Sequence, residues 1–313
     1  MTWLITGGAG YIGGHLVKTM LDSGYEVVVF DNFSSGIRER LPKAVPVVAG
    51  DIRDEEIIAN TLVTFKVTGI INLAALKSVG ESHIIPEEYE AVNHLGVRSL
   101  LRCAVKGGIT TFIQSSTAAV YGHTQNGVAT EESELTPISP YGVTKLAAEE
   151  EVSRFISSGH GQAVSLRYFN VVGSRSKRLK DLGVTNLFPL ILKNISENVS
   201  PTIFGDDYPT FDGTCVRDYV HVEDIARAHV LTVKALESRQ VSRQLNIGTG
   251  LGYSVKEVIS ELLLANKSNL VPSVAARREG DPAILIADPQ LAAAEIGFRA
   301  LKNLREMVET TYG

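Results

Sequence analysis

The chain has 313 residues, of which 44% are hydrophobic and 21% are charged, and its formal net charge is −5. These values are typical of an ordered globular protein with one large or two smaller cores, and they exclude an intrinsically disordered chain. A net negative charge without any long run of Lys or Arg gives no electrostatic surface for DNA, RNA or an anionic membrane.

Short apolar segments, most of them rich in β-branched or aromatic residues, predict strands along the first half of the chain. They span residues 3–6, 26–30, 45–49, 69–74, 111–115 and 163–168. Longer amphipathic segments separate them, which is typical of buried parallel strands joined by crossover helices. The predicted fold class is therefore α/β, with a doubly wound parallel sheet.

Helices are predicted over residues 11–22, 87–106 and 224–236, and from residue 140 to about residue 155. After residue 169 the regular alternation weakens, and loop-forming residues interrupt short apolar runs. We therefore expect one domain over residues 1–169 and a mainly separate, smaller α/β domain over residues 170–313. The helix predicted after residue 215 indicates that the chain crosses back to the first domain around residues 215–238.

Gly7, Gly10 and Gly13 follow one another at intervals of three residues, between the first predicted strand and the first predicted helix. Glycine permits a tight turn there, and it lets backbone N–H groups approach a pyrophosphate that the positive end of the helix stabilises. A tight turn without a ligand has the same glycines. The position between strand and helix nevertheless favours a dinucleotide site.

Asp31 ends the second predicted strand, about 20 residues after this loop, where a carboxylate accepts hydrogen bonds from the adenosine ribose. Its charge would repel a 2′-phosphate, so NAD is preferred over NADP. An ordinary turn residue at the end of a strand is the alternative. Asp51 ends the third predicted strand and is expected near the adenine, although a loop aspartate also serves turns and helix caps.

Tyr141 and Lys145 are four residues apart, so a helix places them on one face. A free tyrosine has a pKa of about 10, but a nearby ammonium and a positive nicotinamide both favour the phenolate that general base catalysis requires. This spacing is also common on solvated helices. The catalytic interpretation depends on Thr117, which follows the fifth predicted strand and offers a hydroxyl to a substrate oxygen.

Together these residues resemble the extended short-chain dehydrogenases/reductases, and the similarity covers nearly the whole chain. Within that family, residues 76–82, 167–170, 207–219 and 277–281 are similar to the 4-epimerases of UDP-sugars. The resemblance implies a Rossmann domain that binds NAD, a second domain that binds the UDP-sugar, and a homodimer formed through the helices over 87–106 and after Tyr141.

The resemblance, added to the residue patterns, gives three sets of candidate residues. The catalytic residues are Tyr141, Lys145 and Thr117. The cofactor contacts are Gly7, Gly10, Tyr11, Ile12, Gly13, Asp31, Asn32, Asp51, Ile52, Leu73, Ala74, Ala75, Lys77, Asn93, Ser115, Tyr141, Lys145 and Tyr168. The substrate contacts are Lys77, Thr117, Tyr141, Phe169, Asn170, Asn186, Leu187, Phe204, Arg217, Tyr219, Arg278, Asp281 and Leu285.

The implied reaction is the interconversion of UDP-glucose and UDP-galactose through a 4-keto sugar, with NAD bound throughout. Arg217 and Arg278 suit the diphosphate because guanidinium groups bind phosphate through bidentate bonds, although each alternatively forms a salt bridge between domains. Dehydratases of the family carry an Asp-Glu pair where this chain has Ala118 and Ala119. Neither methyl group exchanges a proton, so elimination of water is disfavoured.

Other substrates and another class of protein stay open. UDP-pentoses and UDP-uronates are alternative substrates for the same chemistry. Leu285, which replaces a bulky aromatic residue of some family members, predicts room for UDP-N-acetylhexosamines. A non-catalytic, NAD-sensing protein is a different class, but it has no need for Thr117, Tyr141 and Lys145 together.

Cys103 and Cys215 are the two cysteines of the chain. They provide neither a disulfide framework nor a zinc site of paired cysteines. The sequence also shows no signal peptide and no stretch of membrane-spanning length. We therefore expect a soluble, cytoplasmic protein.

Overall fold

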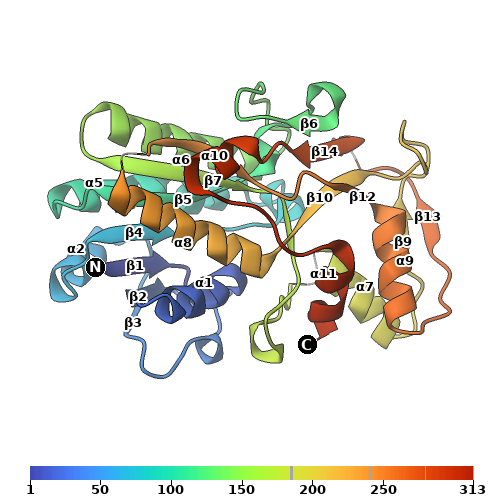
Figure 1. Ribbon diagram of the computed structural model, residues 1–313, viewed down its shortest axis with the longest axis horizontal. Helices are drawn as coiled ribbons and strands as arrows, with labels where there is room; N and C mark the ends of the chain where they lie inside the picture. Colours follow the sequence, from blue (N-terminus) through green and yellow to red (C-terminus); the bar gives the residue numbers. More distant parts are fainter. Residues whose placement is uncertain (184–185, 240, 279, 313) are drawn as a thin grey trace.

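The computed structural model describes residues 1–183, 186–239, 241–278 and 280–312. The larger of the two groups of elements in the described chain is built on a seven-stranded sheet, on the left of Figure 1. The strand order is β11-β7-β5-β4-β1-β2-β3, and all neighbouring strands are parallel. Its strands are β1 (Thr2–Thr6), β2 (Glu26–Asp31), β3 (Val47–Ala49), β4 (Gly69–Asn72), β5 (Thr111–Thr117), β7 (Gln162–Tyr168) and β11 (Arg243–Ile247).

Helices cover both faces of this sheet. One face packs against α1 (Tyr11–Asp22), α8 (Val222–Ser238) and α10 (Gln290–Ile296), and the other against α2 (Glu55–Thr64), α5 (Gly96–Lys106) and α6 (Pro140–Ser157). Each face has its own apolar core, because strands buried on both sides carry apolar side chains in both directions. The structure thus confirms the doubly wound parallel sheet.

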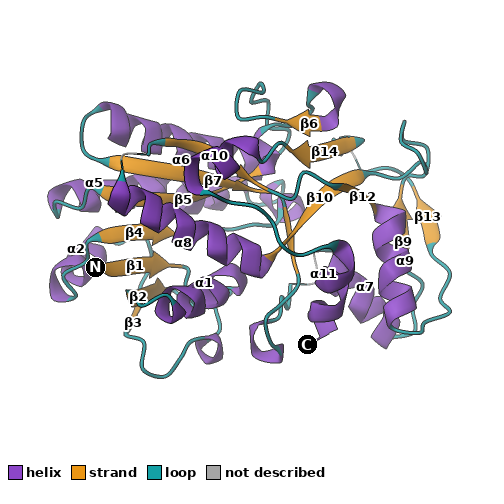
Figure 2. Ribbon diagram, in the orientation of Figure 1, coloured by secondary structure: helices purple, strands orange, loops and turns teal. Residues whose placement is uncertain are grey.

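A smaller group of elements lies on the right of Figure 2. It contains a second sheet in the order β12-β10-β14-β6, with β8 paired to β10, and a pair formed by β9 and β13. The strands are β6 (Val128–Ala129), β8 (Asn170–Val172), β9 (Thr202–Phe204), β10 (Val216–His221), β12 (Gly252–Ser254), β13 (Ser273–Ala275) and β14 (Ile284–Ala287). The helices are α7 (Leu187–Ser196), α9 (Val255–Ala265) and α11 (Leu304–Tyr312).

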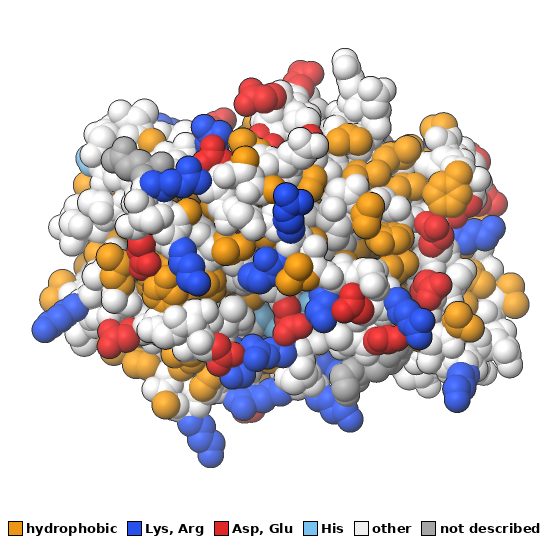
Figure 3. Space-filling model, viewed as in Figure 1, with side chains coloured by type: hydrophobic (Ala, Val, Ile, Leu, Met, Phe, Trp, Pro, Cys, Tyr) orange, Lys and Arg blue, Asp and Glu red, His pale blue; other side chains and the backbone are white. Residues whose placement is uncertain are grey.

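The chain passes between the two groups more than once. After β10 it returns to the large sheet as α8, which runs beside α1 in Figure 1, and then as β11, which pairs with β7. No helix of the described chain is both long and apolar enough to cross a membrane. In Figure 3, side chains of both charges are interspersed over the visible face.

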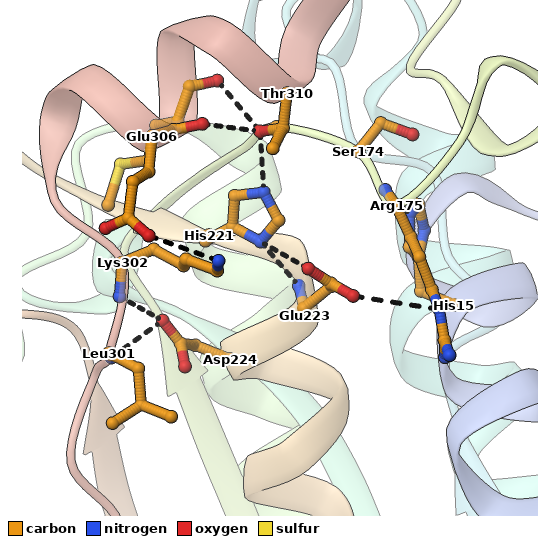
Figure 4. A network of polar contacts seen from close by, with 12 residues as sticks. His15, Ser174, Arg175, His221, Glu223, Asp224, Leu301, Lys302, Glu306 and Thr310 are labelled. Atoms are coloured by element: carbon orange, nitrogen blue, oxygen red, sulfur yellow. Dashed lines mark hydrogen bonds and ion pairs between the residues drawn. The ribbon is translucent and has the colours of Figure 1, made fainter. Parts of the chain in front are cut away.

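A polar network joins the two groups near the carboxyl end of the chain (Figure 4). His221 lies at the start of α8, accepts a hydrogen bond from the Glu223 backbone N–H at 3.1 Å, and contacts the Thr310 hydroxyl at 2.8 Å. The Asp224 carboxylate accepts the Leu301 N–H at 3.0 Å. Burial lowers the pKa of His221 to about 4, so this histidine is neutral at physiological pH.

The helix predicted over residues 87–106 is interrupted in the structure. Residues Pro86–Tyr89 form α4, Glu90–Leu95 adopt a π-helical turn, and α5 follows. The turn contains Asn93, whose side chain bonds both the N–H and the carbonyl of Leu76, at 2.8 and 2.9 Å. Irregular turns of this kind are frequent at functional sites, because they aim a side chain that a regular helix would place elsewhere.

Candidate active site

A cavity of about 510 Å³ lies at the carboxyl ends of the central strands, which is where open α/β sheets bind their ligands. Almost all the predicted cofactor residues line it. They are Gly7, Gly10, Tyr11, Ile12, Gly13, Asp31, Asn32, Asp51, Ile52, Leu73, Ala74, Ala75, Lys77, Ser115, Tyr141, Lys145 and Tyr168. Asn93 is the exception: it is buried behind the cavity and holds the backbone of Leu76.

The glycine loop has the shape that a pyrophosphate requires. Gly7 has a φ of +67°, and a Cβ atom there would lie 2.7 Å from the Ala74 nitrogen. Helix α1 begins after Gly10 with no acidic residue in its first turn, and no side chain within the described chain caps it. Its first N–H groups therefore remain available to an anion at the positive end of the helix.

Asp31 is held in a fixed orientation at the end of β2. Its two carboxylate oxygens accept the backbone N–H groups of Ala9, at 2.9 Å, and of Phe33, at 2.8 Å. Asp51 is engaged differently, because its carboxylate is bonded by Arg53 at 2.8 Å and by Asn32 at 3.0 Å. The Arg53 hydrogen bonds lower the pKa of Asp51 to about 2. Its contact with adenine stays a prediction.

Tyr141 and Lys145 lie in the first two turns of α6. The helix begins at Pro140, after Ser139 has capped it by accepting the Gly142 N–H at 3.1 Å. The Lys145 ammonium donates to the backbone oxygen of Ser115 at 2.8 Å and to its hydroxyl at 3.2 Å. Burial lowers the pKa of Lys145 to about 8, although the negative charge of Glu149 opposes this shift.

The pKa of Tyr141 differs from the sequence expectation. Burial raises it, and a hydrogen bond with the Thr117 hydroxyl partly offsets that effect. The Lys145 ammonium donates to Ser115 on the neighbouring strand. The phenol and the Thr117 hydroxyl nevertheless form one polar pair at the end of β5, where a sugar hydroxyl can exchange a proton with it.

A buried ion pair lies behind this catalytic group. The Arg167 guanidinium donates to both carboxylate oxygens of Glu149, the shortest contact being 2.6 Å, and both side chains are 3% exposed. The Ser116 hydroxyl also donates to Glu149. Arg167 further donates to the Tyr121 hydroxyl at 2.9 Å. These bonds join β5, α6 and β7 directly beneath Tyr141 and Lys145.

The predicted substrate residues gather in two small groups. Arg217 on β10 pairs with Asp281 at 3.4 Å, and the Arg278 guanidinium lies 4.2 Å from the centre of the Phe204 ring. Leu285 is opposite Arg217 in the pairing of β14 with β10. Glu279, within the family-like segment 277–281, lies outside the described residues.

The remaining predicted substrate residues have varied surroundings. Leu285 packs with Phe169 and Ala118, next to Thr117. Asn186 lies at the start of α7, before Leu187, and donates to the Asp181 carboxylate at 2.6 Å. Tyr219 is buried against Phe188, whereas Asn170 is exposed. Their contacts with a substrate stay predictions.

Several cavity residues were not foreseen from the sequence. Asp181 lines the cavity 3.5 Å from the predicted residue Lys77, and Leu182 and Gly183 follow Asp181 along the cavity wall. Arg40 and Arg53 line the cavity as well. None of them belongs to a motif that ends a predicted strand, and a charged residue in a loop gives no signal of its own.

Comparison with known proteins places this geometry in context. The model of the NAD dependent epimerase/dehydratase family matches residues 3–248. The chain is 38% identical to the UDP-glucose 4-epimerase of Corynebacterium glutamicum, covering 100% of this chain and 95% of that protein. It is 36% identical to the UDP-glucose 4-epimerase of Bacillus subtilis, covering 98% of this chain and 94% of that protein.

A solved structure of similar shape is the UDP-glucose-4-epimerase of Stenotrophomonas maltophila with bound NAD and formylated UDP-arabinopyranose. Its TM-score is 0.94 at 36% identity, over 100% of this chain and 97% of that one. The UDP-glucose 4-epimerase of Bifidobacterium longum, in complex with NAD+ and UDP, has a TM-score of 0.91 at 33% identity, over 99% and 97% of the two chains.

Proposed function

Because the chain belongs to the NAD-dependent epimerase/dehydratase family, we propose that it is a UDP-glucose 4-epimerase, which binds NAD in the large cavity and a UDP-hexose beside it. The observation that carries this proposal is the hydrogen-bonded pair of Tyr141 and Thr117 at the end of β5. Lys145, on the same face of α6 as Tyr141, is bound to Ser115 of β5. These are the groups that oxidation of a sugar hydroxyl needs beside a nicotinamide.

When bound in the cavity, NAD would supply the hydride chemistry at sugar carbon 4. Tyr141 removes the proton from the 4-hydroxyl during oxidation and gives it back after the hydride has returned. Thr117 orients the sugar oxygen toward Tyr141, and Lys145 holds the nicotinamide ribose. Ala118 and Ala119, which follow Thr117, offer no proton for elimination, so the ketone is reduced again.

Inversion also requires the sugar to turn between the two hydride transfers. Arg217 and Arg278 bind the diphosphate, and Asp281 orients Arg217 through their ion pair. Firm binding of the UDP portion leaves the hexose free to present its other face. Reduction from that face, with bound NAD supplying the hydride chemistry, would invert the stereocentre at carbon 4 with no net oxidation.

A panel of UDP-sugars tests this proposal. The purified protein with NAD is expected to convert UDP-galactose to UDP-glucose, as measured by chromatography, without accumulation of NADH at 340 nm. Net formation of NADH would instead indicate a dehydrogenase. Conversion of UDP-pentoses or UDP-uronates in place of UDP-hexoses would assign the same chemistry to a different sugar.

The panel also includes UDP-N-acetylglucosamine, because Leu285 leaves more room than an aromatic residue beside Phe169. We expect the wild-type protein to convert this sugar. The Leu285→Tyr variant is expected to convert it at least about tenfold more slowly, while turnover of UDP-galactose changes little, since the larger ring excludes only the N-acetyl group. Equal effects on both sugars would show that Leu285 does not control this choice.

We also propose a cytoplasmic homodimer that associates through the π-helical turn, α5 and α6. Leu95 and Val143 support this interface, because they are 40% and 50% exposed on neighbouring helices. Exposed apolar side chains on adjacent helices are typical of association surfaces. Light scattering is expected to give about twice the chain mass of 33.8 kDa, and a Val143→Lys variant is expected to give a larger monomer fraction.

A further inference from the structure

Two short 3₁₀ turns, Arg38–Arg40 and Lys177–Leu179, exchange hydrogen bonds across the glycine loop. The Arg40 guanidinium donates to the backbone oxygen of Lys180 at 2.8 Å. In return, the Arg178 guanidinium donates to the backbone oxygen of Leu41 at 2.5 Å. Residues about 140 positions apart in the chain are thus fastened to each other by two charge-assisted bonds.

The two turns meet at the first helix of the fold. A Cβ atom on Gly14 of α1 would lie 3.0 Å from the Leu179 side chain and 3.2 Å from Arg40. Arg40 is only 6% exposed, and its Nε finds no partner within the described chain. Burial of this kind fixes the guanidinium beside the glycine loop, since a buried charge is stabilised only by close polar neighbours.

These two hydrogen bonds hold residues 176–183, and this segment runs along the cofactor cavity. Asp181, Leu182 and Gly183 line the cavity, as do Arg40 of the other turn and Ile37 just before it. Two further contacts hold the segment in place. Just before the segment, the Arg175 N–H donates to His15 of α1 at 3.1 Å; both residues are labelled in Figure 4. Within the segment, Asp181 pairs with Lys77.

We propose that residues 176–183 form a strap that retains the dinucleotide, and that Arg40 and Arg178 are positioning residues that fasten it. The proposal rests on the proposed function. An epimerase must hold its cofactor from the removal of the hydride until its return, whereas a dehydrogenase releases the reduced form after each turnover. Asp181, Leu182 and Gly183 of the strap line the same cavity as the glycine loop.

Release of bound NADH measures this role independently of turnover. The wild-type protein and its variants are loaded with NADH and mixed with excess NAD, and the decay of bound NADH fluorescence gives the dissociation rate. Arg40→Gln and Arg178→Gln are each expected to raise this rate by about tenfold. Arg178→Gln removes the bond to the Leu41 oxygen, and Arg40→Gln removes the bond to the Lys180 oxygen together with a longer one, of 3.5 Å, to the Ala9 oxygen. Arg38→Gln is the matched control, since Arg38 is exposed on the same turn and its guanidinium makes no bond to the described chain.

The outcomes separate the strap from its alternatives. Unchanged release from both variants, at an unchanged thermal midpoint, overturns the proposal. Faster release from Arg40→Gln alone also overturns it, because Arg40 lines the cavity and would then act as a direct ligand, whereas Arg178 does not line it. At saturating NAD the Arg178→Gln variant should keep the wild-type kcat, which a general loss of structure would lower.

The proposed function fails in a different way. A wild-type protein that binds no NADH contradicts the epimerase and the strap together. Wild-type conversion of UDP-galactose combined with equal release rates in all variants contradicts the strap alone.

Discussion

Replacing Tyr141 with phenylalanine is expected to lower kcat for UDP-galactose by about 10²–10⁴-fold, the usual loss when a general acid–base group is removed. The phenylalanine ring keeps the shape of the site but loses the hydroxyl that is hydrogen-bonded to Thr117. Binding of NAD should persist, because the glycine loop and Asp31 are unchanged. Steady-state kinetics, with cofactor content measured on the same samples, check both expectations.

Tyr89→Phe is the matched control for this experiment. The Tyr89 ring lies edge-on to Tyr141, with ring centres 6.3 Å apart. Its hydroxyl has two acceptors for its one proton, the Ser78 backbone oxygen at 2.7 Å and the Glu81 carboxylate at 2.8 Å. The Tyr89→Phe variant also loses a phenol oxygen, but from the ring next to Tyr141. Its turnover is therefore expected to stay within a few-fold of wild type. Similar losses in both variants, or undiminished turnover of Tyr141→Phe, would contradict the assignment of Tyr141 as the base.

The sheet could be predicted from sequence because its signals are local. Helix α1 begins and ends at the predicted residues, 11 and 22, and Gly24 beyond it has the left-handed φ of +84° that is common after the end of a helix. The strand β11 was missed, because residues 243–247 alternate weakly and become a strand only by pairing with β7. Helix α2 was missed although a signal was present, since Asp54 caps it by accepting the Glu56 and Ile57 N–H groups.

The site residues also divide into those that local sequence signals could place and those that they could not. The residues that follow the ends of strands, such as Asp31 and Thr117, could be placed because the ends of parallel strands meet at one edge. Arg40 could not be placed, since its partner is the backbone of Lys180, far along the chain. The pKa of Tyr141 was also beyond sequence reasoning, because it depends on the burial of the phenol and on its hydrogen bond with the Thr117 hydroxyl.

Replacing Glu149 with glutamine is expected to lower the free energy of unfolding by about 3–5 kcal/mol, because it leaves the buried guanidinium of Arg167 without its counter-charge. Urea unfolding at neutral pH measures this loss. Glu150→Gln is the matched control on the same helix. Glu150 pairs with Arg154 at 3.6 Å with both side chains more than half exposed, and such pairs contribute at most about 1 kcal/mol.

A double variant separates charge from position. Replacing both partners, as in Glu149→Leu with Arg167→Met, removes the unpaired charge, so most of the lost stability should return. A double variant no more stable than Glu149→Gln would mean that packing, and not the unpaired charge, caused the loss.

Turnover of the double variant is not expected to recover together with its stability. Glu149 lies one turn beyond Lys145 and two turns beyond Tyr141 on α6, and it is bonded to Ser116 of β5 and Arg167 of β7. These bonds fix the helix against the strand that carries Thr117, and apolar side chains of similar volume fix no such register. A stable double variant with wild-type kcat would therefore show that the buried pair serves folding alone. A stable double variant with reduced kcat would show that the pair holds Tyr141 and Thr117 within reach of the same sugar oxygen.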